Sequence, residues 1–179
     1  NEDFLAEYNR QIRTYVIPST VTKIGQLAFA YSNITDLYIP EGVKTMESMA
    51  VFKNTVLLNV FSYTTDEPIT DVTYNAIGSM KTVYNSLPGG LEYIGSYCFY
   101  YCRGLSYLYI PGSIKYIGHH AFWDAVYKEN DELKGITAIN TPLSEEELEK
   151  VEKGDQWRPQ YDYMMFKKSV DINYSTQRQ

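Results

Sequence analysis

The stretch that decides the fold is residues 17–40, IPSTVTKIGQLAFAYSNITDLYIP, because it recurs at residues 87–111 as LPGGLEYIGSYCFYYCRGLSYLYIP. Both copies read P-x-x-φ-x-x-I-G-x-x-small-F and then φ-x-x-L-Y-I-P, where φ is an apolar residue. One such unit cannot bury its apolar side alone, whereas units stacked on each other bury a continuous core. The sequence therefore predicts a stack of short repeats.

Further copies extend the pattern in both directions. The unit from Pro111, PGSIKYIGHHAFWDA, matches well, and the unit from Pro40, PEGVKTMESMAVFKN, matches less well. Residues 62–79 are polar and fit poorly, so we interpret them as an insertion that bulges from the stack. Residues 79–88 then return to the strand segment of the repeat.

Local patterns predict the structure within each unit. In Leu37-Tyr38-Ile39 the aliphatic residues alternate with a tyrosine, which predicts a strand with its aliphatic side chains in the core and its tyrosine outside. The following proline ends the strand because it has no N–H. The I-G-x-x-A-F segment is predicted to form a turn and a short helical piece. Its glycines (Gly25, Gly95 and Gly118) are expected to adopt a backbone conformation that other residues disfavour.

The combination of IGxxAF with LYIP resembles the BspA-like class of leucine-rich repeat, which is found in bacterial surface proteins. The resemblance covers roughly residues 14–142. It implies an α/β repeat fold, namely a right-handed leucine-rich-repeat solenoid with a short-stranded parallel sheet on one face and terminal caps. It also implies an extracellular or cell-surface location and a role in adhesion or ligand capture. The chain itself shows no signal peptide.

The two ends fall outside the repeats. Residues 1–13 are predicted to form an amphipathic helix, either an N-terminal cap or the remnant of an upstream repeat. Residues 143–179 are predicted to form a helix and a capping tail, with Ser144 and Glu147 in a capping box. The bulky residues expected to cover the open end of the stack are Trp157, Tyr161, Met164, Met165 and Phe166.

Composition argues against several functions. The 179 residues carry a formal net charge of −6, which disfavours nucleic-acid binding because phosphates are bound by clustered Lys and Arg. No apolar run approaches the roughly 20 residues of a membrane span. No nucleophile, dinucleotide or metal motif is present, so we predict no enzyme activity, no cofactor and no metal site. The adjacent His119 and His120 are expected to be one surface and one half-buried histidine.

The two cysteines of the chain, Cys98 and Cys102, admit three interpretations: a metal clip, a redox pair or two small side chains in the core. The equivalent positions in the other units hold mainly small residues, and cysteine behaves as a small apolar residue when buried. A zinc site would need four ligands, and no second pair completes one. The pattern favours structural thiols, and a disulfide is not expected.

Tyrosine is the unusual feature, with 18 copies. The outward strand positions, unit by unit, are Thr14 and Val16, Asp36 and Tyr38, Leu58 and Val60, Thr82 and Tyr84, and Tyr107 and Tyr109. We predict an exposed patch in which Tyr38, Tyr84, Tyr107 and Tyr109 bind a ligand. The expected ligand is a host or matrix protein or a glycan. Alternatively, the tyrosines only stabilise the sheet, and the repeats serve as a structural spacer or self-associate as a homodimer through this face.

Overall fold

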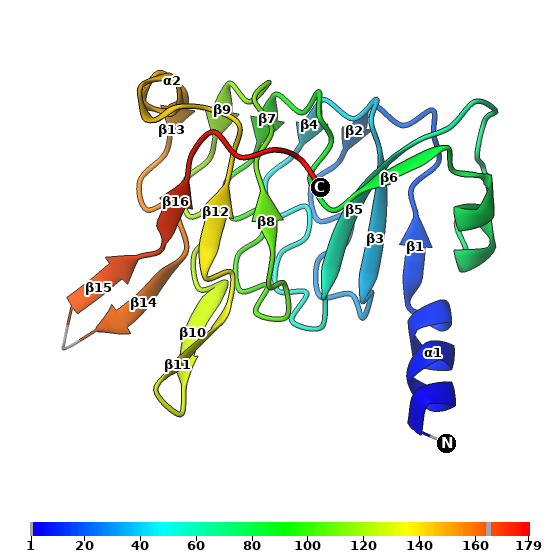
Figure 1. The fold of residues 1–179 in the computed structure, drawn as a ribbon, viewed down its shortest axis with the longest axis horizontal. Coiled ribbons are helices and arrows are strands. Elements are labelled where there is room, and N and C mark those ends of the chain that lie inside the picture. The colour runs from blue at the N-terminus through cyan, green and yellow to red at the C-terminus, as the bar shows by residue number, and fades with distance from the viewer. Residues whose placement is uncertain (1, 164–165) are drawn as a thin grey trace.

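The structure is a computed structural model that describes residues 2–163 and 166–179, and its strands run side by side along two sides of the molecule (Figure 1). The Ile-Gly segments and the equivalent segments of two other units form a five-stranded parallel sheet, the Ile-Gly sheet, in the order β13-β9-β7-β4-β2. Its strands are β2 (Lys23–Ile24), β4 (Thr45–Met46), β7 (Tyr93–Ile94), β9 (Tyr116–Ile117) and β13 (Glu152–Lys153). The sequence predicted turns in these segments and parallel strands only in the LYIP segments. That prediction was wrong, because the structure has a second row of parallel strands here.

The LYIP segments form two further groups of parallel strands. Strands β1 (Thr14–Val16), β3 (Asp36–Pro40) and β5 (Asn59–Thr64) pair in order, and β8 (Leu108–Tyr109), β12 (Ala138–Asn140) and β16 (Asp171–Asn173) form a second sheet. Between the groups, the N–H of Leu87 donates to the carbonyl of Tyr109 at 3.4 Å. We call the outer side of these strands the strand face.

The main hydrophobic core lies between the two lines of strands. Leu37, Ile39, Leu108 and Ile110 are at most 3% exposed, as predicted. They pack in one cluster with the isoleucines and the methionine of the Ile-Gly strands. Alternate residues of each strand therefore point inward, which confirms the predicted repeat pattern.

Two predictions about the strands near the insertion were wrong. Strand β6 (Thr82–Tyr84) runs antiparallel to β5, with Ser62 opposite Tyr84, instead of continuing the parallel repeat. In β5, Val60 lies opposite Leu37 and faces the core, while Phe61 lies opposite Tyr38 on the outside. The prediction that Val60 points outward was wrong by one residue along the strand. A shift of one residue moves every side chain of a strand to the opposite face of the sheet.

The insertion packs against the strand face. It includes the 3-10 helix η1 (Tyr74–Ser79), and its Ile69 and Ala76 form a second buried cluster with Val16, Tyr38 and Tyr63. The hydroxyl of Tyr63 donates to the carbonyl of Ile17 at 2.6 Å. Residues 65–79 therefore cover β1 and β3.

Two of the three glycines, Gly95 and Gly118, are required for a different reason from the one predicted. The left-handed backbone conformations in these turns occur at Leu27, Tyr31, Met49, Lys53, Tyr97, Tyr101, His120 and Asp124, four residues apart within each unit. These residues form turns in place of the predicted helical piece. These two glycines instead permit close approach of neighbouring units. A Cβ on Gly95 would lie 2.3 Å from the Ser48 backbone nitrogen, and one on Gly118 would lie 2.2 Å from that of Ser96.

The N-terminal helix forms as predicted but does not cover the core. Helix α1 (Glu2–Ile12) points away from the strands (Figure 1), held by an ion pair of 3.1 Å between Arg10 and Asp36. Its apolar side chains Phe4, Leu5, Tyr8 and Ile12 are 53–68% exposed.

The C-terminal region begins with the predicted helix. Helix α2 (Glu145–Glu149) has the capping box, in which Ser144 N–H donates to Glu147 Oε2 at 2.8 Å and Glu147 N–H donates to Ser144 Oγ at 3.2 Å. Trp157 is buried in the core and Tyr161 packs against it. Met164, Met165 and the Phe166 side chain lie outside the described residues.

Two antiparallel hairpins project near this end of the stack (Figure 1). One joins β10 (Val126–Glu129) to β11 (Glu132–Gly135), and the other joins β14 (Gln160–Tyr163) to β15 (Phe166–Ser169).

The close approach of the units predicts different effects for two glycine substitutions in the same repeat position. Gly118→Ala would force a Cβ against the backbone of Ser96, so the free energy of unfolding should fall by about 1–3 kcal/mol. Gly25→Ala is the matched control, because its nearest neighbour is a side-chain oxygen at 3.9 Å. It should change stability by less than about 1 kcal/mol. Urea denaturation measures both values, and equal values would contradict the steric explanation.

Candidate binding surface

Two of the four tyrosines predicted to bind a ligand are buried. Tyr38 is 5% exposed and Tyr109 is 3% exposed. Tyr38 lies in the cluster formed with the insertion and stacks on Phe61 with a centroid distance of 4.8 Å. Tyr109 donates its hydroxyl hydrogen to the carbonyl of Thr176 at 3.1 Å. The predicted exposure of these two side chains was wrong because distant segments of the chain cover them.

The other two predicted tyrosines are half-buried. Tyr84 lies on the antiparallel strand β6, and the guanidinium carbon of Arg178 is 4.0 Å from its ring centroid. Tyr107 directly precedes β8, and burial raises its pKa. Tyr38 and Tyr109 belong to different sheets, so the structure does not gather the four tyrosines into one open patch.

The last residues of the chain cover part of the strand face. The N–H of Thr176 donates to the carbonyl of Thr141 at 2.9 Å, and the N–H of Asn85 donates to the carbonyl of Gln179 at 2.7 Å. We call residues 175–179 the C-terminal strap. The strand face therefore has two intramolecular occupants, the insertion and the strap.

The turns between the two lines of strands present an aromatic surface that sequence analysis missed. We define the aromatic ridge as Tyr31, Phe52, Tyr97, Tyr100, Tyr101 and Trp123. Ring centroids are 5.6 Å apart between Tyr31 and Phe52, 5.1 Å between Phe52 and Tyr100, and 6.1 Å between Tyr100 and Trp123. The contacts run without interruption across four repeat units.

The turn geometry explains why these rings lie outside the core. Phe99 and Phe122 are fully buried, and the residue after each of them, Tyr100 or Trp123, is half-buried. The same position in the four units reads Ala30, Phe52, Tyr100 and Trp123. This column is the sequence pattern that could have predicted the aromatic ridge. Successive side chains of an extended backbone point to opposite sides, so an aromatic residue next to a buried phenylalanine is expected to point away from the core.

The ridge combines one exposed ring and five half-buried rings with the cationic side chains of Lys53 and Arg103. Tyr31 is 68% exposed and neighbouring Leu27 is 50% exposed. Lys53 Nζ lies 5.5–6.0 Å from the ring centroids of Phe52, Tyr100 and Tyr101. The guanidinium of Arg103 lies 3.9 Å from the centroid of Tyr101. Cations at these distances are attracted to aromatic rings and hold them in place.

The histidines lie at one end of the ridge. His120 is 8% exposed, and its ring nitrogens lie 3.2 Å from the Tyr97 hydroxyl and 2.6 Å from Gln156 Oε1. Desolvation is the main cause that lowers its pKa, which favours the neutral ring. His119 is half-buried. Within residues 2–163 and 166–179, no three His, Cys, Asp or Glu side chains lie together in a way that could hold a metal ion.

The cysteines are core residues, as predicted. Cys98 and Cys102 are free thiols, both fully buried, and Cys102 Sγ donates to the carbonyl of Val51 at 3.2 Å. Burial raises the pKa of Cys98 strongly and that of Cys102 to about 12. The thiolate forms that bind metals and attack disulfides are therefore disfavoured.

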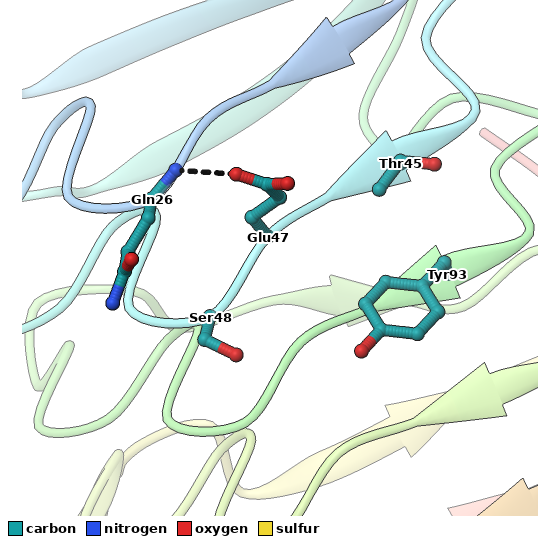
Figure 2. Close-up of a pocket in the computed structure, with 5 residues that line it drawn as sticks. All are labelled: Gln26, Thr45, Glu47, Ser48 and Tyr93. Carbon is teal, nitrogen blue, oxygen red and sulfur yellow. Dashed lines mark hydrogen bonds between the residues drawn. The ribbon is translucent and has the colours of Figure 1, made fainter.

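A hollow of about 420 Å³ lies on the Ile-Gly side, lined by Gln26, Thr45, Glu47, Ser48 and Tyr93 (Figure 2). Glu47 accepts the backbone N–H of Gln26 at 3.0 Å and pairs with Lys23. The hydrogen bond from Lys23 is the main cause that lowers the pKa of Glu47. Glu47 is the single carboxylate in the lining, so the hollow lacks the paired acid and base of a hydrolase.

The stacked parallel strands and the repeated turns define a leucine-rich-repeat protein. Residues 4–129 match the BspA type leucine-rich repeat region in six copies, and the chain belongs to this family. No curated protein and no solved structure matches the chain. In the part of the chain that the structure describes, no helix has the length and apolar character needed to cross a membrane.

The burial of both thiols predicts that native protein resists thiol reagents. We expect Ellman's reagent to leave Cys98 and Cys102 unmodified in the folded chain and to label both in denaturant, because the thiolates form only after exposure. A Ser106→Cys variant supplies an accessible control thiol, since Ser106 is exposed. Native cysteines that react as fast as this control would contradict their assignment as structural thiols.

Proposed function

We propose that the chain is a non-catalytic binding module of a bacterial surface or secreted protein, and that its units form a right-handed leucine-rich-repeat solenoid. The family match and the parallel pairing of the strands support this fold. The BspA-type family supports a surface or extracellular location. The proposed activity is adhesion to a host or matrix protein.

The observation that carries this proposal is the aromatic ridge, which spans four units. Tyrosine, tryptophan and arginine are enriched where protein interfaces derive most of their binding free energy. Tyr31 and Arg103 each contact one ring of a set that is already held by mutual contact. Rings that are ordered before binding lose less conformational entropy when a partner docks.

The ring geometry favours a protein partner over a glycan. Sugars stack on the free face of an aromatic ring, and the stacking of Phe52 on Tyr100, with an interplanar angle of 14°, leaves at most one face of each ring for a sugar. The rings in mutual contact form a continuous aromatic surface, which suits apolar side chains of a partner.

A binding screen tests the ridge. We expect the wild-type chain to bind an immobilised matrix protein, and the double variant Tyr31→Ala, Tyr100→Ala to bind at least tenfold more weakly, since hot-spot residues contribute about 1.4 kcal/mol or more. Tyr93→Ala is the matched control, because Tyr93 is 37% exposed on the Ile-Gly sheet, away from the ridge. Circular dichroism verifies that each variant is folded. An equal loss in the control, or undiminished binding by the double variant, would contradict the proposal.

The second candidate is a structural spacer or self-association module, and the N-terminal end of the stack favours it. Strand β2 is the edge strand of its sheet, and beside it lies a hollow of about 200 Å³ lined mainly by apolar side chains, including Tyr15, Val21 and Phe29. Helix α1 presents its exposed apolar side chains at the same end. A second copy of the chain could cover both surfaces.

Self-association at this end predicts a concentration-dependent dimer. The double variant Phe4→Ser, Ile12→Ser should shift the chain to a monomer in light scattering after gel filtration, because it removes apolar area that the dimer would bury. Val83→Ser is the control, since Val83 is 40% exposed elsewhere on β6. A wild-type chain that is monomeric at all concentrations would rule out this dimer.

A further inference from the structure

The C-terminal strap lies on the strand face in the manner of a bound peptide. Exposure alternates along it: Thr176 and Arg178 are half-buried, whereas Ser175, Gln177 and Gln179 are exposed. Thr176 donates its hydroxyl hydrogen to the carbonyl of Thr141 at 3.0 Å. An extended segment with alternate side chains inward is the usual form of a peptide recognised by a sheet face or edge.

Arg178 is the anchor of the strap. Its Nη1 donates to Glu41 Oε2 at 3.1 Å, and its Nη2 donates to Glu41 Oε1, so the ion pair is bidentate. Its Nε donates to Ser86 Oγ at 2.5 Å, and its Nη2 also donates to Ser62 Oγ and to the carbonyl of Leu87, the latter at 3.2 Å. The Tyr84 ring completes the site from one side.

The groups that receive this guanidinium are held by the rest of the fold. Ser62 is 0% exposed and Ser86 is 2% exposed, and their hydroxyl oxygens are 3.2 Å apart. Glu41 follows β3 and accepts the N–H of Gly89 at 2.9 Å. Buried hydroxyls and a partly buried carboxylate are unfavourable without partners. Their arrangement fits the planar, five-donor guanidinium better than the single ammonium of lysine.

We propose that this pocket is a recognition site for an arginine on an extended peptide of a partner protein, with the C-terminal strap as its intramolecular occupant. The recognised pattern is Thr-x-Arg, because Thr176 and Arg178 are the strap residues that contact the site. Tyr84 and Tyr109, two of the tyrosines predicted to bind a ligand, contact this occupant. The proposal is independent of the aromatic ridge, which lies on the turns.

Exchange of the strap for a peptide is physically reasonable because few backbone contacts hold it. Among the described residues, the backbone–backbone hydrogen bonds of the strap are Ser175 N–H to Leu143 at 3.1 Å, Thr176 N–H to Thr141, and Asn85 N–H to Gln179. The hydroxyl groups of Tyr109 and Thr176 add two further hydrogen bonds. The Arg178 side chain makes the densest set of contacts in the strap, and a partner's arginine can replace it with the same donors.

A chain that lacks residues 175–179 tests the site with the peptide acetyl-STQRQ-amide as probe. In isothermal titration calorimetry the peptide should bind the truncated chain, and it should bind the 179-residue chain at least tenfold more weakly because the strap competes. The peptide acetyl-STQKQ-amide should bind the truncated chain at least tenfold more weakly than the arginine peptide. Glu41→Gln in the truncated chain should weaken arginine-peptide binding by a similar factor. A folded truncated chain that fails to bind, or that binds both peptides equally, would overturn the proposal.

If the truncated chain does not fold, the variant Arg178→Ala in the 179-residue chain tests whether the site binds an external arginine. It empties the guanidinium pocket but retains the rest of the strap. Acetyl-arginine amide should bind this variant and acetyl-lysine amide should bind at least tenfold more weakly, as measured by NMR chemical-shift titration. A folded variant without arginine binding, or a variant that is itself unfolded, would overturn the proposal and identify Arg178 as a fixed structural residue.

Discussion

The fold depends on hydrogen bonds between the turns of successive units. Alternate turn residues donate their backbone N–H to the next unit: Phe29 to Ala50, Val51 to Cys98, Phe99 to Ala121, and Phe122 to Trp157, at distances of 2.7–3.0 Å. This bonding brings neighbouring units close together. The short spacing requires small side chains in the column of Ala50, Cys98 and Ala121, and it leaves no room for a Cβ at Gly95 or Gly118. The same hydrogen bonding makes the large turn residues point alternately into the core and onto the aromatic ridge.

The features that sequence predicted correctly are those set within one unit or by its periodic recurrence. The inward aliphatic residues of β3 and β8, the small column that contains the cysteines, and the capping box of α2 all belong to this class. Each is decided by side chains a few residues apart or by the same position in the next unit. Such features need no knowledge of how distant segments pack.

The features that sequence did not predict depend on contacts between distant segments. Tyr38 is buried because residues 69 and 76 pack over it, and Tyr109 because Thr176 reaches its hydroxyl. The outward pattern of the strands is the same whether or not another segment covers them, so exposure could not be read from it. The antiparallel β6 follows the insertion, where the repeat signal is weakest. The hydroxyl of Tyr63 stabilises the start of the insertion by its hydrogen bond to the carbonyl of Ile17. Burial of this hydroxyl raises the pKa of Tyr63 to about 12.

The two sides of each turn are under different constraints, and this difference bears on function. Inside, the spacing between units limits the buried column of Ala50, Cys98 and Ala121 to small residues, whereas the equivalent Ala28 is exposed. Outside, the column of Ala30, Phe52, Tyr100 and Trp123 is half-buried and includes large rings, so it is not under that limit. Its residues increase in size along the stack, which packing of the core does not require. The outer column can therefore vary without disturbing the hydrogen bonds beneath it, whereas the strand face is constrained by the insertion and the strap that pack on it.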